Sequence, residues 1–197
     1  MKMFDKIKWI AGISLIFIIV LATNLIDKNN FSRLSYSVRT IYEDRIIAND
    51  LIFGMSILIQ EKEIAIAMSD PIFFKKRNTD IDQKLTNLIK KYEQTKLTEK
   101  EHFVLNKFKN NLIDLQNLEK KHADLDFSQK ALSLQKINNI VHNFSDLSKI
   151  QLIEGKRQMV MSERTAHTIN LFTQIEIIFL IFLAILVQII VLYRPKN

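Results

Sequence analysis

The chain has 197 residues, a formal net charge of +7 and 48% hydrophobic residues. Basic and acidic residues are mixed along residues 27–168, which excludes the segregated basic face of a nucleic-acid-binding protein. Cysteine is absent, which excludes disulfides, thiolate catalysis and Cys-ligated metals.

Turn-forming residues are scarce. The chain holds 3 glycines and 2 prolines, where average usage predicts roughly 14 and 10 for this length. Tight turns depend on these two residue types, so the composition predicts an all-α fold made of long helices with few connections.

The first predicted element is a membrane-spanning helix at residues 9–26, which contain no charged residue. A run of about 20 apolar residues crosses the ~30 Å hydrocarbon layer. Residues 1–8, with three lysines, then form a cytoplasmic tail. A cleaved signal peptide is the alternative, although the run exceeds the usual 7–15 residue apolar core and lacks a small-x-small cleavage site.

A long helix is predicted to follow at residues 27–69. Proline cannot continue a helix and excludes the helical conformation from the residue before it, so this helix ends at Asp70-Pro71. Arg45 and Lys62 interrupt its apolar stripe. The stripe recurs at three- and four-residue steps, typical of a coiled coil, and comprises Phe31, Leu34, Val38, Ile41, Ala48, Ile52, Met55, Ile59 and Ile66.

Two shorter helices come next. Thr98 and Glu101 form a capping box, which predicts that the third helix begins at about residue 99. Lys75, Lys76 and Arg77 lie before the second helix, as a solvated basic turn or as a contact for an anionic partner. The two apolar stripes are Ile81, Leu85, Leu88 and Tyr92, and then Leu105, Phe108, Leu112 and Leu115.

A fourth helix is predicted after capping residues in the segment 124–128, and it continues into a second span at residues 169–193. Its stripe is Leu134, Ile137, Val141 and Phe144. Residues 194–197 form the second cytoplasmic tail. Glu176 lies either at the membrane boundary, just before the uninterrupted apolar run, or as an ionisable group inside the bilayer.

These lengths predict an antiparallel, up-down-up-down four-helix bundle at residues 27–168, flanked by the two spans. The outer helices reach about 60–65 Å and the middle pair only about 36 Å, so the membrane-proximal half holds two helices. A two-helix stalk buries only part of its apolar stripe, which predicts a homodimer.

This layout, with the stretch Tyr42-Glu43-Asp44-Arg45 on the first helix, resembles the sensory domain of bacterial methyl-accepting chemotaxis proteins. The first helix of that domain often carries a similar Tyr-x-Asp-Arg-hydrophobic stretch, and the likeness covers nearly the whole chain. In that family the bundle is periplasmic and dimeric, and some members bind amino acids or organic acids through arginines on the first helix.

The resemblance implies that Arg45, with Tyr42 and Asp44 beside it, binds a small organic anion or amino acid. Aspartate-binding members have a second arginine one turn further on, where this chain has Asn49 and Asp50. Family members also continue into a HAMP linker and a kinase-binding coiled coil, whereas this sequence ends at Asn197. The resemblance therefore implies a separate membrane signalling partner.

The residues themselves leave an alternative for Arg45, which is an ion pair within or between helices. Catalytic chemistry has no support, because no nucleophile and base are recognisable together. The histidines His102, His122, His142 and His167 form no His-x-x-x-His or Glu-x-x-His pair. We expect no enzyme, no metal site and no cofactor.

The leading functional hypothesis is a chemoreceptor-like sensory module in the bacterial inner membrane. Both tails lie in the cytoplasm and the central domain is periplasmic, because loops longer than about 60 residues translocate largely regardless of charge. The alternative is a non-sensory envelope scaffold whose coiled-coil stripe pairs with a partner helix.

Overall fold

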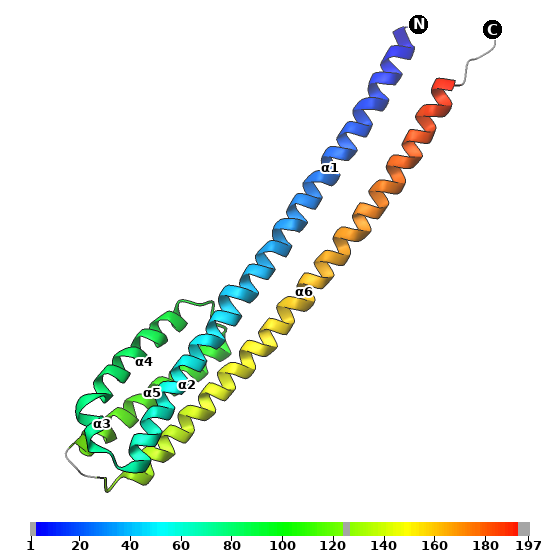
Figure 1. The fold of residues 1–197 in the computed structure, drawn as a ribbon. Helices are drawn as coiled ribbons and strands as arrows, with labels where there is room; N and C mark the ends of the chain where they lie inside the picture. Colours follow the sequence, from blue (N-terminus) through cyan, green and yellow to red (C-terminus); the bar gives the residue numbers. More distant parts are fainter. Residues whose placement is uncertain (1–2, 124–126, 193–197) are drawn as a thin grey trace. The chain divides into compact units, whose positions relative to one another are not determined.

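The computed structural model describes residues 3–123 and 127–192, and these residues are almost entirely helical (Figure 1). The predicted all-α class is confirmed. The elements, in chain order, are α1 (Met3–Ile41), η1 (Tyr42–Ile46), α2 (Ile47–Met68), α3 (Pro71–Lys76), α4 (Asn78–Glu93), α5 (Glu99–Ala123) and α6 (Lys130–Leu192).

The chain divides into two compact units. The central unit is Arg39–Gln158, and the terminal unit combines Met1–Val38 with Met159–Asn197. Two elements cross the division: α1 leads into the central unit, and α6 leads out of it.

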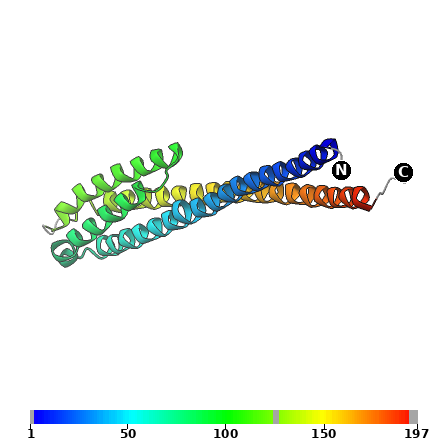
Figure 2. The ribbon, with the colours of Figure 1, turned by 90° about the horizontal axis from the view of Figure 1, so that it is seen from above.

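In the terminal unit, α1 and α6 run antiparallel and side by side (Figures 1 and 2). The Thr23 hydroxyl donates to Glu176 Oε1 at 2.7 Å. Glu176 therefore lies level with Thr23, about one helical turn before the end of the apolar run at residues 9–26.

Among the described residues, one helical segment is long and apolar enough to cross a membrane. This segment is Lys130–Leu183 of α6, and its apolar window is not buried by the rest of the protein. The first predicted span includes side chains outside the described part. Of the predicted tails, residues 3–8 belong to α1, whereas residues 1–2 and 194–197 lie outside the described residues.

The elements α1, η1 and α2 form one continuous helix, here called helix one, which ends at Met68. Ser69 takes a left-handed conformation with φ of 53°. The Asp70 carboxylate accepts from the backbone N–H groups of Ile72 and Phe73, which starts α3 with Pro71 in its first turn. The predicted end of helix one is thus confirmed, but the short helix α3 was not predicted.

The capping box of α5 is present as predicted. The backbone N–H of Thr98 donates to Glu101 Oε2 at 2.6 Å, and the backbone N–H of Glu101 donates to the Thr98 hydroxyl at 3.3 Å. Of the residues predicted to cap the fourth helix, 124–126 lie outside the described part. The helix itself, α6, continues without a break from Lys130.

The apolar core lies in the central unit and draws on α2, α3, α4, α5 and α6. The predicted stripe positions of residues 105, 108, 112 and 115 are all buried, but Val141 is 42% exposed and Ile140 takes the core position instead. Phe31 and Val38, in the terminal unit, are exposed. The buried apolar residues are Ala48, Leu51, Ile52, Met55, Ile59, Ala65, Ile66, Phe73, Phe74, Ile81, Leu85, Ile89, Tyr92, Leu105, Phe108, Leu112, Leu115, Ile137, Ile140, Phe144 and Leu147.

Candidate functional site

The three residues predicted to bind a ligand, Tyr42, Asp44 and Arg45, all lie in the π-helical turn η1. A π turn has i→i+5 hydrogen bonds and so contains more residues per turn than an α-helix, and such turns frequently occur at functional sites. Ile41 and Ile47 flank η1 with ordinary helical dihedral angles, so helix one changes register there without breaking.

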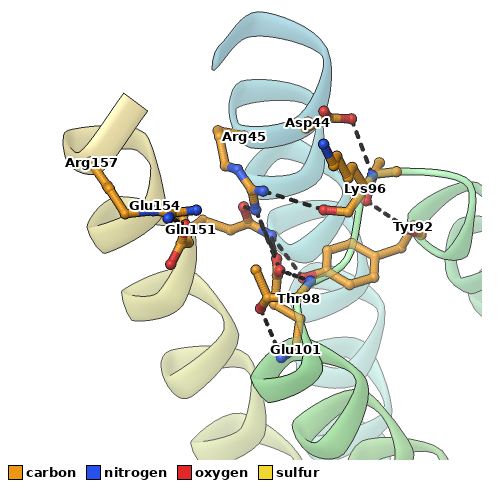
Figure 3. Close-up of polar contacts among 10 residues, drawn as sticks. Asp44, Arg45, Tyr92, Lys96, Thr98, Glu101, Gln151, Glu154 and Arg157 are labelled. Atoms are coloured by element: carbon orange, nitrogen blue, oxygen red, sulfur yellow. Dashed lines mark hydrogen bonds and ion pairs between the residues drawn. The ribbon is translucent and has the colours of Figure 1, made fainter. Parts of the chain in front are cut away.

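The Arg45 side chain points into the central unit and is buried (Figure 3). Its Nη1 donates to Glu101 Oε1 at 3.1 Å and to Gln151 Oε1 at 2.9 Å. The Gln151 amide in turn donates to the Tyr92 hydroxyl at 2.9 Å. These four residues, here called the Arg45 network, join η1, α4, α5 and α6.

The π turn also holds the connection between α4 and α5. Asp44 Oδ1 accepts from the backbone N–H of Lys96 at 3.1 Å, and Arg45 Nη2 donates to the Lys96 carbonyl at 3.3 Å (Figure 3). Asp44 and Arg45 thus bind the N–H group and the carbonyl group of the same residue, Lys96. Because Glu101 caps α5 and also pairs with Arg45, the start of α5 is tied directly to η1.

Tyr42 is not part of this network. Its residue is 59% exposed. Arg45, in contrast, is buried, and Asp44 contacts the connection between α4 and α5. On the surface of the same turn, Arg39 Nε pairs with Glu43 at 2.9 Å. The structure therefore brings two of the three predicted residues together and leaves the third on the outside of helix one.

Burial sets the electrostatics of the Arg45 network. A buried charge is tolerated when it is paired and hydrogen-bonded, and Arg45 meets this condition through Glu101. Arg45 Nε, however, is buried and has no hydrogen-bond partner among the described residues. Burial is also the main reason why the pKa of Tyr92 is raised above its ordinary value of about 10.

A second buried cluster lies further along helix one, around Lys62, whose side chain is fully buried. Its Nζ contacts Glu119 Oε2 at 2.6 Å, Asp82 Oδ1 at 2.9 Å and Asn78 Oδ1 at 2.6 Å. These residues, here called the Lys62 cluster, come from α2, α4 and α5. Both interruptions of the predicted stripe, Arg45 and Lys62, are thus core residues with buried partners.

Glu119 is the least satisfied member of the Lys62 cluster. Its Oε2 accepts from Lys62 and from the Asn78 amide at 3.1 Å. Its Oε1 is buried and has no hydrogen-bond partner within the part of the chain that the structure describes. Burial raises the pKa of Glu119, and this effect outweighs the opposing effect of the Lys62 charge.

The histidines have different environments. His122 is buried, stacks on Phe127 with ring centroids 4.7 Å apart, and lies 3.0 Å from the Ser133 hydroxyl. His102, His142 and His167 are exposed. In the described part of the chain, no group of three His, Cys, Asp or Glu side chains is placed to hold a metal ion.

An open groove of about 460 Å³ lies between the start of α5 and the first third of α6. Its lining combines apolar side chains, among them Phe103, with charged side chains of both helices. It adjoins Glu101 in sequence, but neither Glu101 nor Arg45 lines it. The lining residues are Glu99, Lys100, Phe103, Val104, Asp146, Lys149 and Ile150.

The sequence interpretation missed the partners of the two buried cations. From the sequence, Glu101 is predicted only as a cap, and no local pattern indicates Gln151, Asp82 or Glu119. The sequence does indicate that such partners are present, because a Lys or Arg at a core position of an apolar stripe requires a buried partner. The sequence does not show which carboxylate on another helix supplies it.

Comparisons of this chain with models of protein families, with curated proteins and with solved structures give no match. The functional interpretation therefore rests on the residues and geometry described above.

Proposed function

We propose that this protein is a membrane-anchored sensory module, chemoreceptor-like in layout, whose central unit is an antiparallel four-helix bundle. In this proposal two spans, in α1 and α6, anchor the chain in a bacterial inner membrane with the central unit on the periplasmic side. The apolar window of α6 supports membrane association.

One observation carries the sensory proposal. The Arg45 network connects helix one to α6, and these are the two helices that continue into the terminal unit. Its contacts are polar and directional, so a ligand that engages Arg45 competes directly with the contacts that join the two helices. A ligand can shift such an arrangement only if it binds one of two states more tightly.

The proposed ligand is a small organic anion or an amino acid, taken up beside η1 by Arg45 with Asp44. Arg45 Nε has no partner in the described structure and supplies one free donor for a carboxylate. Entry requires the connection at residues 94–98 to move, because Arg45 is buried and its Nη2 is hydrogen-bonded to the Lys96 carbonyl of that connection.

A thermal-shift screen tests this proposal. The full chain in detergent micelles is heated with amino acids, dicarboxylates and other small organic anions. A ligand at 100 times its dissociation constant should stabilise the folded state by about 2.7 kcal/mol. This shift should disappear in Arg45→Lys and persist in the surface control Arg39→Lys. No shift with any anion from the folded protein would favour the second candidate function.

The second candidate is an envelope scaffold that associates through helix one, either with a second copy or with a partner helix. Exposed apolar residues recur on the outer face of helix one, from the end of η1 through α2, at steps of seven and four residues, as in a coiled-coil seam. They are Ile46, Phe53, Ile57, Ile64 and Met68.

Cysteine cross-linking tests association of this face, because the natural chain contains no cysteine. If two copies meet along α2, Ile57→Cys should give a disulfide-linked dimer in the membrane. The control Lys90→Cys, on the exposed side of α4, should remain monomeric. Equal cross-linking at both positions would indicate random collision and argue against a dimer through α2.

A further inference from the structure

The Lys62 cluster has an excess of negative charge. It contains one cation, Lys62, and two carboxylates, Glu119 and Asp82, so its net charge is −1 when all three groups are ionised. The Arg45 network differs, because there one cation meets one buried carboxylate. Asp82 is 27% exposed, whereas Glu119 is buried. A second negative charge beside a buried carboxylate is costly unless a further positive group neutralises it.

No neighbouring side chain supplies that positive group in the described structure. From α4, Asp82 faces the cluster and also accepts from the Gln116 amide at 3.0 Å. On α5 itself, His122 lies one turn beyond Glu119, but its Nε2 lies 3.0 Å from Ser133 Oγ of α6.

The basic residues nearby are directed elsewhere. Arg77 pairs with Glu61 on the surface, and Lys130 of α6 donates to the carbonyl of Ala67 and to Ser69. Lys75 and Lys76 of α3 are exposed. Lys62 is therefore the cation that Glu119 and Asp82 share.

We propose that the Lys62 cluster is a proton-binding site, in which Glu119 takes up one proton on Oε1 as the medium becomes acidic. Proton uptake removes the excess charge and turns the partnerless carboxylate oxygen into part of a neutral carboxyl group. Lys62 then remains paired with Asp82. This site goes beyond the proposed anion-binding function and does not depend on it.

The direction of the pKa shift agrees with this geometry. Burial raises the pKa of Glu119, and the nearby Asp82 charge raises it further. A group with a raised pKa in the folded state binds its proton more tightly than in the unfolded state. The resulting stabilisation is fully present below the unfolded pKa of about 4.3 and is lost as pH rises through the folded pKa.

Infrared titration of the full chain in detergent micelles tests proton binding directly. The carbonyl band of a protonated, buried carboxyl group should appear at a pH above the range of exposed glutamates, and it should be absent from Glu119→Gln. In Asp82→Asn the same band should appear only at lower pH, because the excess charge that favours protonation has been removed. The exposed control Glu63→Gln should titrate like the natural protein.

Thermal unfolding as a function of pH gives a second measurement. Because the folded chain binds the proton more tightly than the unfolded chain does, the melting temperature should rise on acidification. Glu119→Gln should lack this part of the pH dependence, while Glu63→Gln should keep it. A band that persists in Glu119→Gln, or parallel melting curves for the natural protein and Glu119→Gln at every pH, would overturn the proposal.

Discussion

Arg39 and Arg45 lie on the same helix, but the structure gives their charges different surroundings. The Arg39–Glu43 pair is exposed on one helix, where water and salt screen the interaction. The Arg45–Glu101 pair is buried between two helices and shares a polar network. Removal of Arg45 would leave the Glu101 charge buried without its cation, and that loss costs more than the pair itself contributes.

We therefore expect Arg45→Ala to lower the free energy of unfolding by about 3–5 kcal/mol. Arg39→Ala should lower it by about 1 kcal/mol at most. Denaturant unfolding of the full chain in detergent, followed by circular dichroism, measures both values. Equal and small effects of the two substitutions would mean that the Glu101 carboxylate is not buried as described.

Tyr92 provides a pH-dependent prediction at the same scale. Its pKa is raised mainly by burial, so the phenol should stay protonated at a pH where exposed tyrosines ionise. The stability that depends on the neutral phenol is present below pH about 10 and is lost as pH rises through the raised pKa.

Phenolate absorbance between neutral pH and pH about 11 measures this difference. Tyr92→Phe should leave the absorbance change of the folded protein unaltered and reduce only the amplitude that appears on unfolding. A reduced signal from folded Tyr92→Phe would contradict the burial of Tyr92.

At the scale of elements, the π turn η1 determines which residues of helix one face the core. A π turn accommodates one additional residue. Removal of one residue there can therefore restore a regular α-helix, and the flanking segments keep the same side chains directed toward the core. Removal of one residue from regular α-helix instead rotates everything on one side of the deletion by about 100°.

Deletion of the exposed Glu43 should therefore cost about 1 kcal/mol or less, the value of its surface ion pair. Deletion of the exposed Asn49 in α2 should displace Arg45 from its buried partner and cost about 3–5 kcal/mol. Circular dichroism and denaturant unfolding compare the two variants. If both deletions cost the same, η1 does not take up the lost residue.

The sequence predicted the regular parts of this fold and few of its irregular parts. Apolar periodicity located α4 and α5, and Asp70-Pro71 and the Thr98–Glu101 capping box marked boundaries, because each depends on local chemistry. The π turn has no residue signature of its own, and α3 is too short for a periodic pattern.

The candidate sites were predictable only in part for a related reason. Arg45 and Lys62 stand out within an apolar stripe, but their partners Glu101 and Glu119 lie more than 50 residues away. Charged residues on the other helices have similar local contexts, and only the packing of the helices selects among them. The pKa shift of Glu119 likewise depends on burial that no local pattern encodes.

At the scale of the whole molecule, the absence of cysteine makes topology directly measurable. If both tails lie in the cytoplasm, a membrane-impermeant maleimide should label Lys76→Cys in spheroplasts and label Lys6→Cys only after the membrane is permeabilised. The natural chain serves as the unlabelled control. Labelling in the opposite order would place the central unit in the cytoplasm and contradict the proposed topology.

The two buried ion pairs have a mechanical consequence for the central unit. Arg45–Glu101 and Lys62–Glu119 fix helix one lengthwise to α5 at two points about 27 Å apart. A slip of one helical turn, about 5.4 Å, would separate both pairs at once. The register between helix one and α5 can therefore change only if two buried pairs break in the same step, so the two helices move along their axes as one body.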